Sequence, residues 1–128
     1  MLGKLKILII DDEEDFGHFI KLNLERTGEF EVLVSTEGKQ GIVLAKSHNP
    51  DLILLDIMMP EMDGTEIAEH LLDDTSTKDI PIVFLTALVK KGELKDKTGR
   101  IAGRYFIAKP VTSDELIAKI KSVLEKRS

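Results

Sequence analysis

The sequence predicts an α/β fold in which a parallel five-stranded sheet lies between two layers of helices, a doubly wound three-layer (βα)5 sandwich. The first observation is that short apolar runs of strand length alternate along the chain with longer segments of helical period. The second is that most of these runs are apolar throughout, which is typical of strands buried on both faces. Parallel strands need right-handed crossover connections, so helices must cover both faces of such a sheet.

The strand segments differ in how completely apolar they are. The first is rich in isoleucine, which suits a strand covered on both faces. The second carries more polar residues, which predicts a place nearer the edge of the sheet. The predicted strands are Lys4–Ile10, Phe30–Ser35, Leu52–Leu55, Pro81–Leu85 and Tyr105–Ala108.

Amphipathic segments with helix start and stop signals follow the strands. The first has acids in its opening turn and Gly28 after its last turn, and Asn49-Pro50 ends the second. Thr112 and Glu115 form a capping box that opens the last helix. The predicted helices are Glu13–Thr27, Thr36–Ser47, about Asp63–Asp73, and a C-terminal helix from Thr112. The residues expected to face the sheet are Phe16, Phe19, Ile20 and Leu24 in the first helix, Ile42, Val43 and Ala45 in the second, and Ile67, Leu71 and Leu72 in the third.

Two helical segments are weakly specified. Gly38 and Gly41 lower the helix propensity at the start of the second helix. The segment Val89–Gly103 has Leu94 and Ile101 as its main large apolar residues, among many lysines and glycines. We expect it to form a short helix within a long connection.

Composition limits the classes of protein to which the chain can belong. With 128 residues the chain is expected to be one domain, 1–128, of ordinary globular composition. It has no cysteine, which favours a reducing, cytoplasmic location over a disulfide-stabilised or thiolate-metal protein. No apolar run approaches the roughly 18 residues of a membrane span. The net charge of −5 and the lack of a basic stripe argue against direct nucleic-acid binding.

Polar residues that end four of the strands supply the chemistry. The carboxyl ends of parallel strands lie at one edge of a sheet, where ligands bind. In this chain the residues at those ends are Asp11 and Asp12, Asp56, Thr86, and Lys109. Each has a simpler interpretation, namely a helix cap for the acids, a strand-end threonine and a surface lysine. Their convergence on one edge favours a site that combines three acids, a hydroxyl and an ammonium group.

These residue types predict a magnesium-dependent phosphoryl site. Three neighbouring carboxylates repel each other, and a hard divalent cation such as Mg²⁺ relieves that repulsion. The cation and the ammonium group would draw charge from the phosphoryl oxygens, while the hydroxyl would donate a hydrogen bond. Asp56, at the centre of the three ends, can act as the nucleophile and form a labile aspartyl phosphate.

Four motifs give the chain a resemblance to a known family over its whole length. They are ILIIDDEED, PDLILLDIMMPEMDG, PIVFLTA and FIAKPVTSDEL, in that order. With them the chain resembles the response-regulator receiver domains of two-component signalling. The resemblance implies a flavodoxin-like strand order 2-1-3-4-5, and a sensor histidine kinase or histidine phosphotransfer protein as phosphoryl donor. It further implies a phosphorylation switch of stand-alone type that acts on a downstream protein and is not an enzyme in the ordinary sense, and it leaves a phosphorylation-dependent homodimer open.

The resemblance also assigns roles to individual residues. It makes Asp56 the phosphoacceptor, Asp12 a direct Mg²⁺ ligand and Asp11 a ligand that acts largely through water. It makes the backbone carbonyl of Met58 a further ligand, and it has Lys109 pair with the phosphoryl oxygens, aimed by a cis bond to the proline that follows.

The switch residues implied by the resemblance are Thr86, which would bond the phosphoryl group, and Phe106, which would follow it to a buried rotamer. The family more often has tyrosine at the position of Phe106, and acidic or small residues where Arg104 and Tyr105 stand. We therefore expect a change in this chain to be transmitted through packing and not through a phenolic hydroxyl.

The residues of this chain argue against three other functions. A phosphatase of the haloacid-dehalogenase type has a second aspartate two residues after the nucleophile, where this chain has Met58. A flavin protein of similar fold needs a Ser/Thr/Gly-rich phosphate loop after Ile10, and none is present. A vestigial interaction module would have lost site residues, whereas all are present.

The sequence also predicts slow self-dephosphorylation. Met58 lies two residues after Asp56, and Leu88 lies two residues after Thr86, so both apolar side chains should crowd an attacking water.

Overall fold

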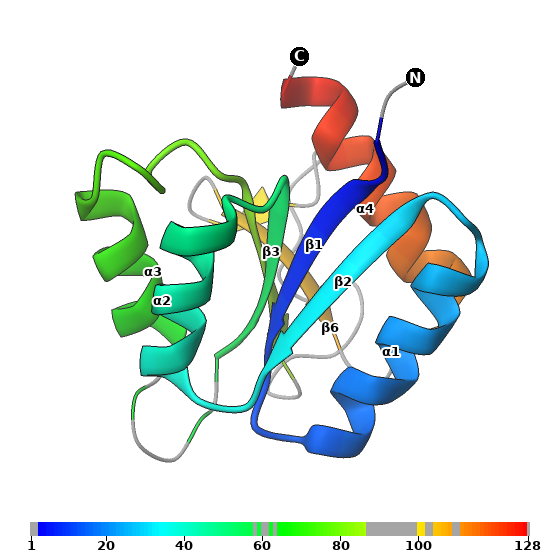
Figure 1. The fold of residues 1–128 in the computed structure, drawn as a ribbon, viewed down its shortest axis with the longest axis horizontal. Helices are drawn as coiled ribbons and strands as arrows, with labels where there is room; N and C mark the ends of the chain where they lie inside the picture. Colours follow the sequence, from blue (N-terminus) through cyan, green and yellow to red (C-terminus); the bar gives the residue numbers. More distant parts are fainter. Residues whose placement is uncertain are drawn as a thin grey trace.

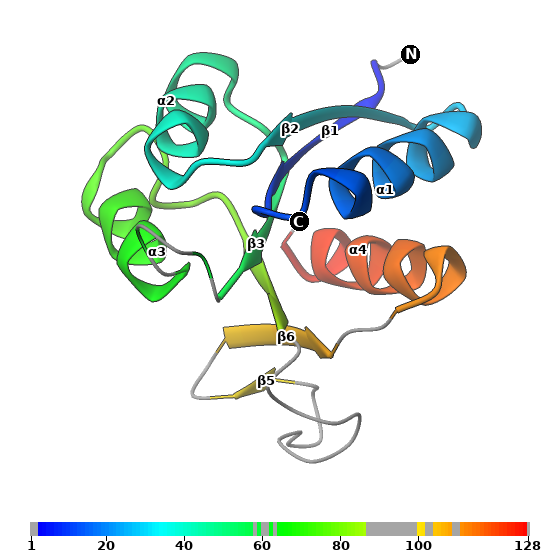
Figure 2. The same cartoon turned by 90° about the horizontal axis from the view of Figure 1, so that it is seen from below.

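Over the residues that the structure describes, the chain forms a three-layer sandwich in which a central sheet separates two pairs of helices (Figures 1 and 2). The coordinates are a computed structural model that describes residues 3–57, 59, 62, 64–86, 100–101, 104–108 and 111–127. The strands are β1 (Leu5–Ile10), β2 (Phe30–Ser35), β3 (Leu52–Asp56), β4 (Ile82–Thr86), β5 (Arg100–Ile101) and β6 (Arg104–Ala108). The helices are α1 (Glu14–Arg26), α2 (Gly38–His48), α3 (Gly64–Asp73) and α4 (Ser113–Arg127). None of these helices is long and apolar enough to cross a membrane.

The order of strands in the sheet is β2-β1-β3-β4-β6-β5. The neighbours from β2 to β6 pair in parallel, so the predicted strands, counted along the chain, take the predicted order 2-1-3-4-5. The more polar β2 lies at the edge, as its composition indicated. The short β5 is an addition, since it pairs antiparallel with β6 on the other edge.

Each face of the sheet has its own apolar core. Alternate residues of β1, such as Ile7 and Leu8, point to opposite faces and are fully buried. On one face α1 and α4 cover the sheet, with Ile20 of α1 and Ile120 of α4 in the core. On the other face α2 and α3 cover it, with Ile67 of α3 in the core. Both cores are apolar, so the polar residues of β1 and β3 lie only toward the ends of these strands.

Local signals that ended or began helices in the sequence are confirmed. Asn49 lies in the left-handed region with φ 51°, where it ends α2. Gly28, with φ 80°, follows the end of α1 and donates its backbone N–H to the carbonyl of Glu25. The capping box of α4 is formed by two reciprocal hydrogen bonds of 3.1 Å between Thr112 and Glu115.

The two glycines of α2 allow close packing. A Cβ atom at Gly41 would lie 2.5 Å from Cδ1 of Ile10, and one at Gly38 would lie 2.8 Å from Cδ1 of Ile67. The same atom at Gly38 would come within 3.3 Å of Sδ of Met62. The glycines weaken the helix in isolation, and they let it approach β1, α3 and the loop before α3 more closely than any other residue could.

Three apolar residues expected to face the sheet are exposed instead, and these predictions were wrong. Val43 is 61% exposed, whereas its neighbour Leu44 packs against the core. Phe19 is 55% exposed and Leu72 is 40% exposed. Each lies at the margin of an apolar stripe, and the curvature and neighbours of the helix decide on which side of the margin a residue falls.

The predicted helix Val89–Gly103 is contradicted in its last part. Arg100 and Ile101 form β5, with Arg100 opposite Tyr105 and Ile101 opposite Arg104. Only two residues separate Ile101 from Arg104, a spacing typical of a tight hairpin. Pairing with β6 therefore overrides the weak helical pattern there, while residues 89–99 lie outside the described part of the chain.

Asp74, just after α3, connects the two helices on one face of the sheet. Its Oδ1 accepts hydrogen bonds from the backbone N–H and the hydroxyl of Ser76, at 2.8 and 2.6 Å. Its Oδ2 lies 3.2 Å from Nζ of Lys46 in α2. The hydrogen bonds from Ser76, and then the one from Lys46, lower the pKa of the Asp74 carboxyl from 3.8 to about 2.

The lowered pKa of Asp74 predicts how its contribution to stability depends on pH. The folded-state pKa lies below the unfolded value, so the contribution is fully present above about pH 4 and is lost as the pH falls through about 2. An NMR titration of the carboxyl carbon should give the lowered pKa. In Asp74→Asn the free energy of unfolding should fall less steeply than in wild type between pH 4 and 2. Identical slopes would contradict the assignment, and Asp73→Asn, at the neighbouring position, is the matched control.

Candidate functional site

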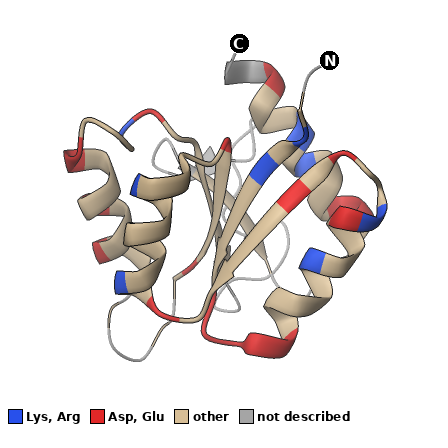
Figure 3. Ribbon diagram, viewed as in Figure 1, with Lys and Arg blue, Asp and Glu red and all other residues tan. Residues whose placement is uncertain are grey.

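Parallel pairing of β1 with β3 brings the acids of the two motifs together. Ile10 lies opposite Leu55, so Asp11 and Asp56, the next residues of each chain segment, leave the sheet side by side. Residues 7–10 of β1 and 52–55 of β3 are all apolar, so these acids are the first polar groups after the buried stretch of each strand. Figure 3 shows the acidic segment where β1 passes into α1, at the carboxyl edge of the sheet.

The three acids form one cluster. Carboxylate oxygens of Asp11, Asp12 and Asp56, one from each, lie within 4.8 Å of one another. In the part of the chain that the structure describes, this is the one group of three acidic, histidine or cysteine side chains that close. Asp11 is fully buried and Asp56 is 4% exposed, whereas Asp12 is exposed to solvent. The cluster is therefore anchored in the protein and open on the side of Asp12.

Asp11 does not cap α1, since the N-cap of that helix is Glu13, but its carboxylate shapes the turn that leads into the helix. Its Oδ1 accepts a hydrogen bond of 2.9 Å from the backbone N–H of Glu13, which orients the carboxylate just before α1. Its own N–H donates to the carbonyl of Ser35, so the β1–β2 pairing extends to this residue. One carboxylate thus both shapes the turn into α1 and contributes an oxygen to the cluster.

The donor set fits a hard divalent cation. Oxygen ligands of one Mg²⁺ lie about 3 to 4 Å apart, because each Mg–O distance is about 2.1 Å. Carboxylate oxygens that lie within 4.8 Å of one another are close to the separation that one shared cation needs. Carboxylates are the oxygen donors that Mg²⁺ prefers, and a cation would offset the repulsion between Asp11 and Asp56, which burial strengthens. A nearly buried carboxylate at such a site can accept an electrophile only from the open side.

The remaining predicted site residues are placed in part. Thr86 is the last residue of β4 and lies opposite Ala108 of β6, the residue just before Lys109. The ends of β3 and β4 are neighbours in the sheet, so the backbone of Thr86 lies at the same edge as that of Asp56. Lys109 itself and Met58 lie outside the described residues.

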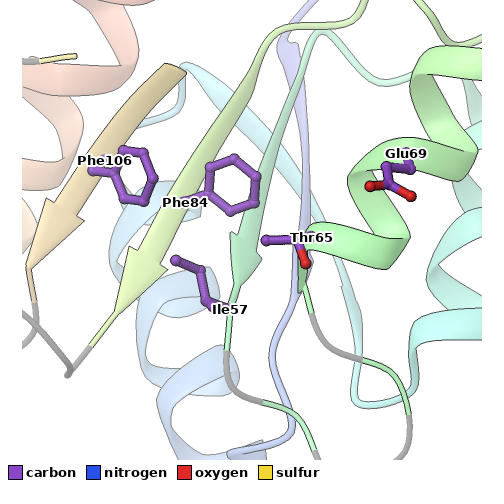
Figure 4. A pocket seen from close by; sticks show the side chains of 5 residues that line it. All are labelled: Ile57, Thr65, Glu69, Phe84 and Phe106. Atoms are coloured by element: carbon purple, nitrogen blue, oxygen red, sulfur yellow. The ribbon is translucent and has the colours of Figure 1, made fainter. Parts of the chain in front are cut away.

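Phe106 belongs to an aromatic pair that the sequence did not reveal. Its ring stacks on that of Phe84 with 5.1 Å between centroids and 27° between planes. The two residues lie opposite each other in β6 and β4, on the face covered by α2 and α3. With Ile57, Thr65 and Glu69 they line a hollow of about 150 Å³, shown in Figure 4. Phe84 stands in an all-apolar strand, so only the register of β4 with β6 could have singled it out.

Comparison with known sequences decides the family. The family model described as the response regulator receiver domain matches residues 7–121. The chain belongs to this family. Among curated relatives of the receiver domain, the phosphate regulon transcriptional regulatory protein PhoB of Pseudomonas aeruginosa is 40% identical over 128 residues, 98% of this chain and 54% of PhoB. The DNA-binding dual master transcriptional regulator RpaA of Synechocystis is 37% identical over 123 residues, 94% of this chain and 49% of RpaA.

Solved structures agree with this assignment. The receiver domain of the Francisella response regulator 1452 is similar with a TM-score of 0.79 and 27% identity, over 98% of this chain and 100% of the other. Vibrio cholerae CheY4, a chemotaxis protein, shares the fold with a TM-score of 0.80 at 22% identity, over 94% of this chain and 99% of that one. The receiver domain described here spans about half the length of the curated relatives named above.

Repulsion within the acid cluster predicts the effect of removing one charge. In metal-free protein Asp12→Asn should raise the free energy of unfolding by on the order of 1 kcal/mol, because two like charges about 4 Å apart near water repel by about that much. Urea unfolding at low salt measures it, and added salt should reduce the gain. Asp15→Asn is the control, since Asp15 is an exposed acid at the start of the same helix. An equal effect of both substitutions would contradict the repulsion.

Proposed function

We propose that this receiver domain takes a phosphoryl group from a phosphohistidine onto Asp56 in a reaction that needs Mg²⁺, and that its partner-binding face then changes. The observation that carries the proposal is the cluster of Asp11, Asp12 and Asp56 at one sheet edge, in a chain of this family. The donor would be a sensor histidine kinase or a histidine phosphotransfer protein.

The proposed step is an in-line displacement at phosphorus. A carboxylate oxygen of Asp56 attacks, the P–O bond to Asp56 forms, and the P–N bond to the donor imidazole breaks with its electron pair leaving on nitrogen. Bound Mg²⁺ would supply positive charge to the phosphoryl oxygens. Burial holds Asp56 in one orientation, which reduces the entropy lost on reaching the reactive geometry. Asp11 and Asp12 would hold the cation, Asp11 largely through water.

The further site residues complete the proposal. Lys109 would pair with the phosphoryl oxygens, Thr86 would donate its hydroxyl to them, and the carbonyl of Met58 would add a metal ligand. Phe106 would transmit the change. Because it has no hydroxyl and stacks on Phe84, we infer that the new state is transmitted by the packing of this pair.

We propose a switch and not a turnover enzyme. The position two residues after Asp56, where a phosphatase of the haloacid-dehalogenase type has its acid/base aspartate, is Met58. Self-dephosphorylation would therefore depend on unassisted water. The absence of cysteine supports a cytoplasmic location.

We propose the downstream partners of the domain with the help of its relatives. The similar proteins PhoB and RpaA are named as transcriptional regulators, and this chain matches about half of each. The 128 residues would form one receiver domain that acts on a downstream protein and does not itself contact nucleic acid, in keeping with the net charge of −5. A homodimer that forms on phosphorylation is a further candidate output.

Phosphorylation is tested directly with a small donor. Purified protein with acetyl phosphate and Mg²⁺ should gain the mass of one phosphoryl group, and the gain should disappear without Mg²⁺. Asp56→Asn should not gain mass, because it lacks the attacking carboxylate, whereas the control Asp15→Asn should behave as wild type. Intact-mass spectrometry measures both. A phosphorylated Asp56→Asn would refute the assignment of the acceptor.

Mg²⁺ should also stabilise the folded protein. Only the folded chain brings the three carboxylates together, so at 100 times the dissociation constant the ion should add about 2.7 kcal/mol to the free energy of unfolding. Thermal unfolding with and without Mg²⁺ measures the shift in Tm. Asp56→Asn should reduce that shift, and Asp73→Asn, distant in sequence from the cluster, should not. A wild-type Tm that does not respond to Mg²⁺ would contradict the metal site.

A further inference from the structure

Gly64 brings the start of α3 into direct contact with the segment that carries the proposed phosphoacceptor. It is the buried first residue of α3, and its backbone N–H donates a hydrogen bond of 2.7 Å to the carbonyl of Ile57. Ile57 follows Asp56 directly, and its own N–H donates to the carbonyl of Leu85 in β4 at 3.1 Å. The peptide after Asp56 is therefore held between β4 on one side and the start of α3 on the other.

The space at Gly64 is bounded by backbone. A Cβ atom there would lie 2.5 Å from the carbonyl oxygen of Asp56, 2.7 Å from Cα of Ile57 and 3.1 Å from the carbonyl carbon of Asp56. Cβ atoms essentially never come within 3.0 Å of another atom, so an added methyl group would force backbone to move. Gly64 is helical, so the requirement is for room and not for an unusual φ.

Other tightly packed glycines differ in what they contact. At Gly17 of α1 the close atom would be Cγ1 of Val34, at 2.8 Å, which is the end of a side chain. A shift of the Val34 side chain on the edge strand leaves the acceptor segment in place, whereas the Asp56–Ile57 peptide is itself held by hydrogen bonds to β4 and to α3. A methyl group at Gly64 would thus displace the atoms that orient Asp56, while one at Gly17 would displace a side chain of the edge strand.

We propose that Gly64 is a positioning residue for the phosphorylation site. By letting α3 pack against the Asp56–Ile57 peptide, it sets the direction of the Asp56 backbone. This inference rests on the proposed function, because it specifies how the same site is kept in its reactive geometry. A displacement of about 1 Å at such a site can reduce a rate by about 100-fold.

The test compares Gly64→Ala with Gly17→Ala. Urea unfolding gives the loss of stability in each, and an NMR titration of backbone amides gives the Mg²⁺ dissociation constant. Gly64→Ala should weaken Mg²⁺ binding about 10- to 100-fold, as loss of a residue that orients metal ligands does. It should slow phosphorylation by acetyl phosphate in similar proportion. Gly17→Ala should stay within about twofold of wild type in both, even where its loss of stability is as large.

The outcomes separate this inference from the function on which it rests. Equal Mg²⁺ affinities and phosphorylation rates in the two variants would overturn the role of Gly64 while leaving Asp56 as acceptor. A wild type that binds Mg²⁺ but never gains a phosphoryl group would overturn the proposed function. The Mg²⁺ dissociation constants of the two variants would still test whether Gly64 positions the site.

A measurement on wild type covers the case in which Gly64→Ala does not fold. The Gly64 amide, bonded to the Ile57 carbonyl, should exchange its hydrogen more slowly when Mg²⁺ is bound, since ordering at Asp56 restrains the same peptide. The buried Thr77 amide, bonded to the carbonyl of Asp74 after the last turn of α3, is the internal control. Unchanged exchange at Gly64 on saturation with Mg²⁺ would overturn the proposal.

Discussion

Parallel pairing of β1 with β3 is the constraint on which the rest of the structure depends. It sets Ile10 opposite Leu55 and so forces two carboxylates, Asp11 and Asp56, to leave the sheet next to each other. Both are buried, and like charges in such surroundings repel strongly, so this edge is costly unless a cation or a hydrogen-bond donor compensates. The cost is local to the site, because β1 and β3 are otherwise wholly apolar in the core.

Helix packing on one face of the sheet then holds the edge in place. Glycines let α2 and α3 approach the strands closely, and the approach of α3 at Gly64 is made against the backbone of the acceptor segment itself. Met62, in the loop before α3, packs between these helices and the sheet. Two elements therefore hold the site in place. They are the sheet, from which the acids extend, and α3, whose first residue packs against the backbone of Asp56. Because Gly64 of α3 packs against the backbone of Asp56 and Ile57, a displacement of that backbone would also displace the start of α3.

On the same face, an aromatic pair lies close to the segment that follows Asp56. Phe106 stacks on Phe84, and Ile57, one residue after Asp56, lines the hollow beside them. Ile57 is hydrogen-bonded to Leu85 of β4, the residue after Phe84. Ile57 thus joins Asp56 to the strand that carries Phe84 through one covalent and one hydrogen-bonded link. At the edge of the sheet, β5 pairs with β6, which the helical pattern of the sequence did not predict.

The sequence by itself determined the fold class and the identity of the three acids, because strands covered on both faces must be apolar and must end where a charge appears. The strand order came from the resemblance of its motifs to those of receiver domains. It also determined the capping box of α4 and the end of α2, which depend on neighbouring residues alone. Only the tertiary structure decided that Val43 is exposed and Leu44 packed, that Arg100 and Ile101 extend the sheet, and that Phe84 meets Phe106. The closeness of Gly64 to Asp56 belongs with these, since such contacts arise between segments whose distance is set by packing and not by local propensity.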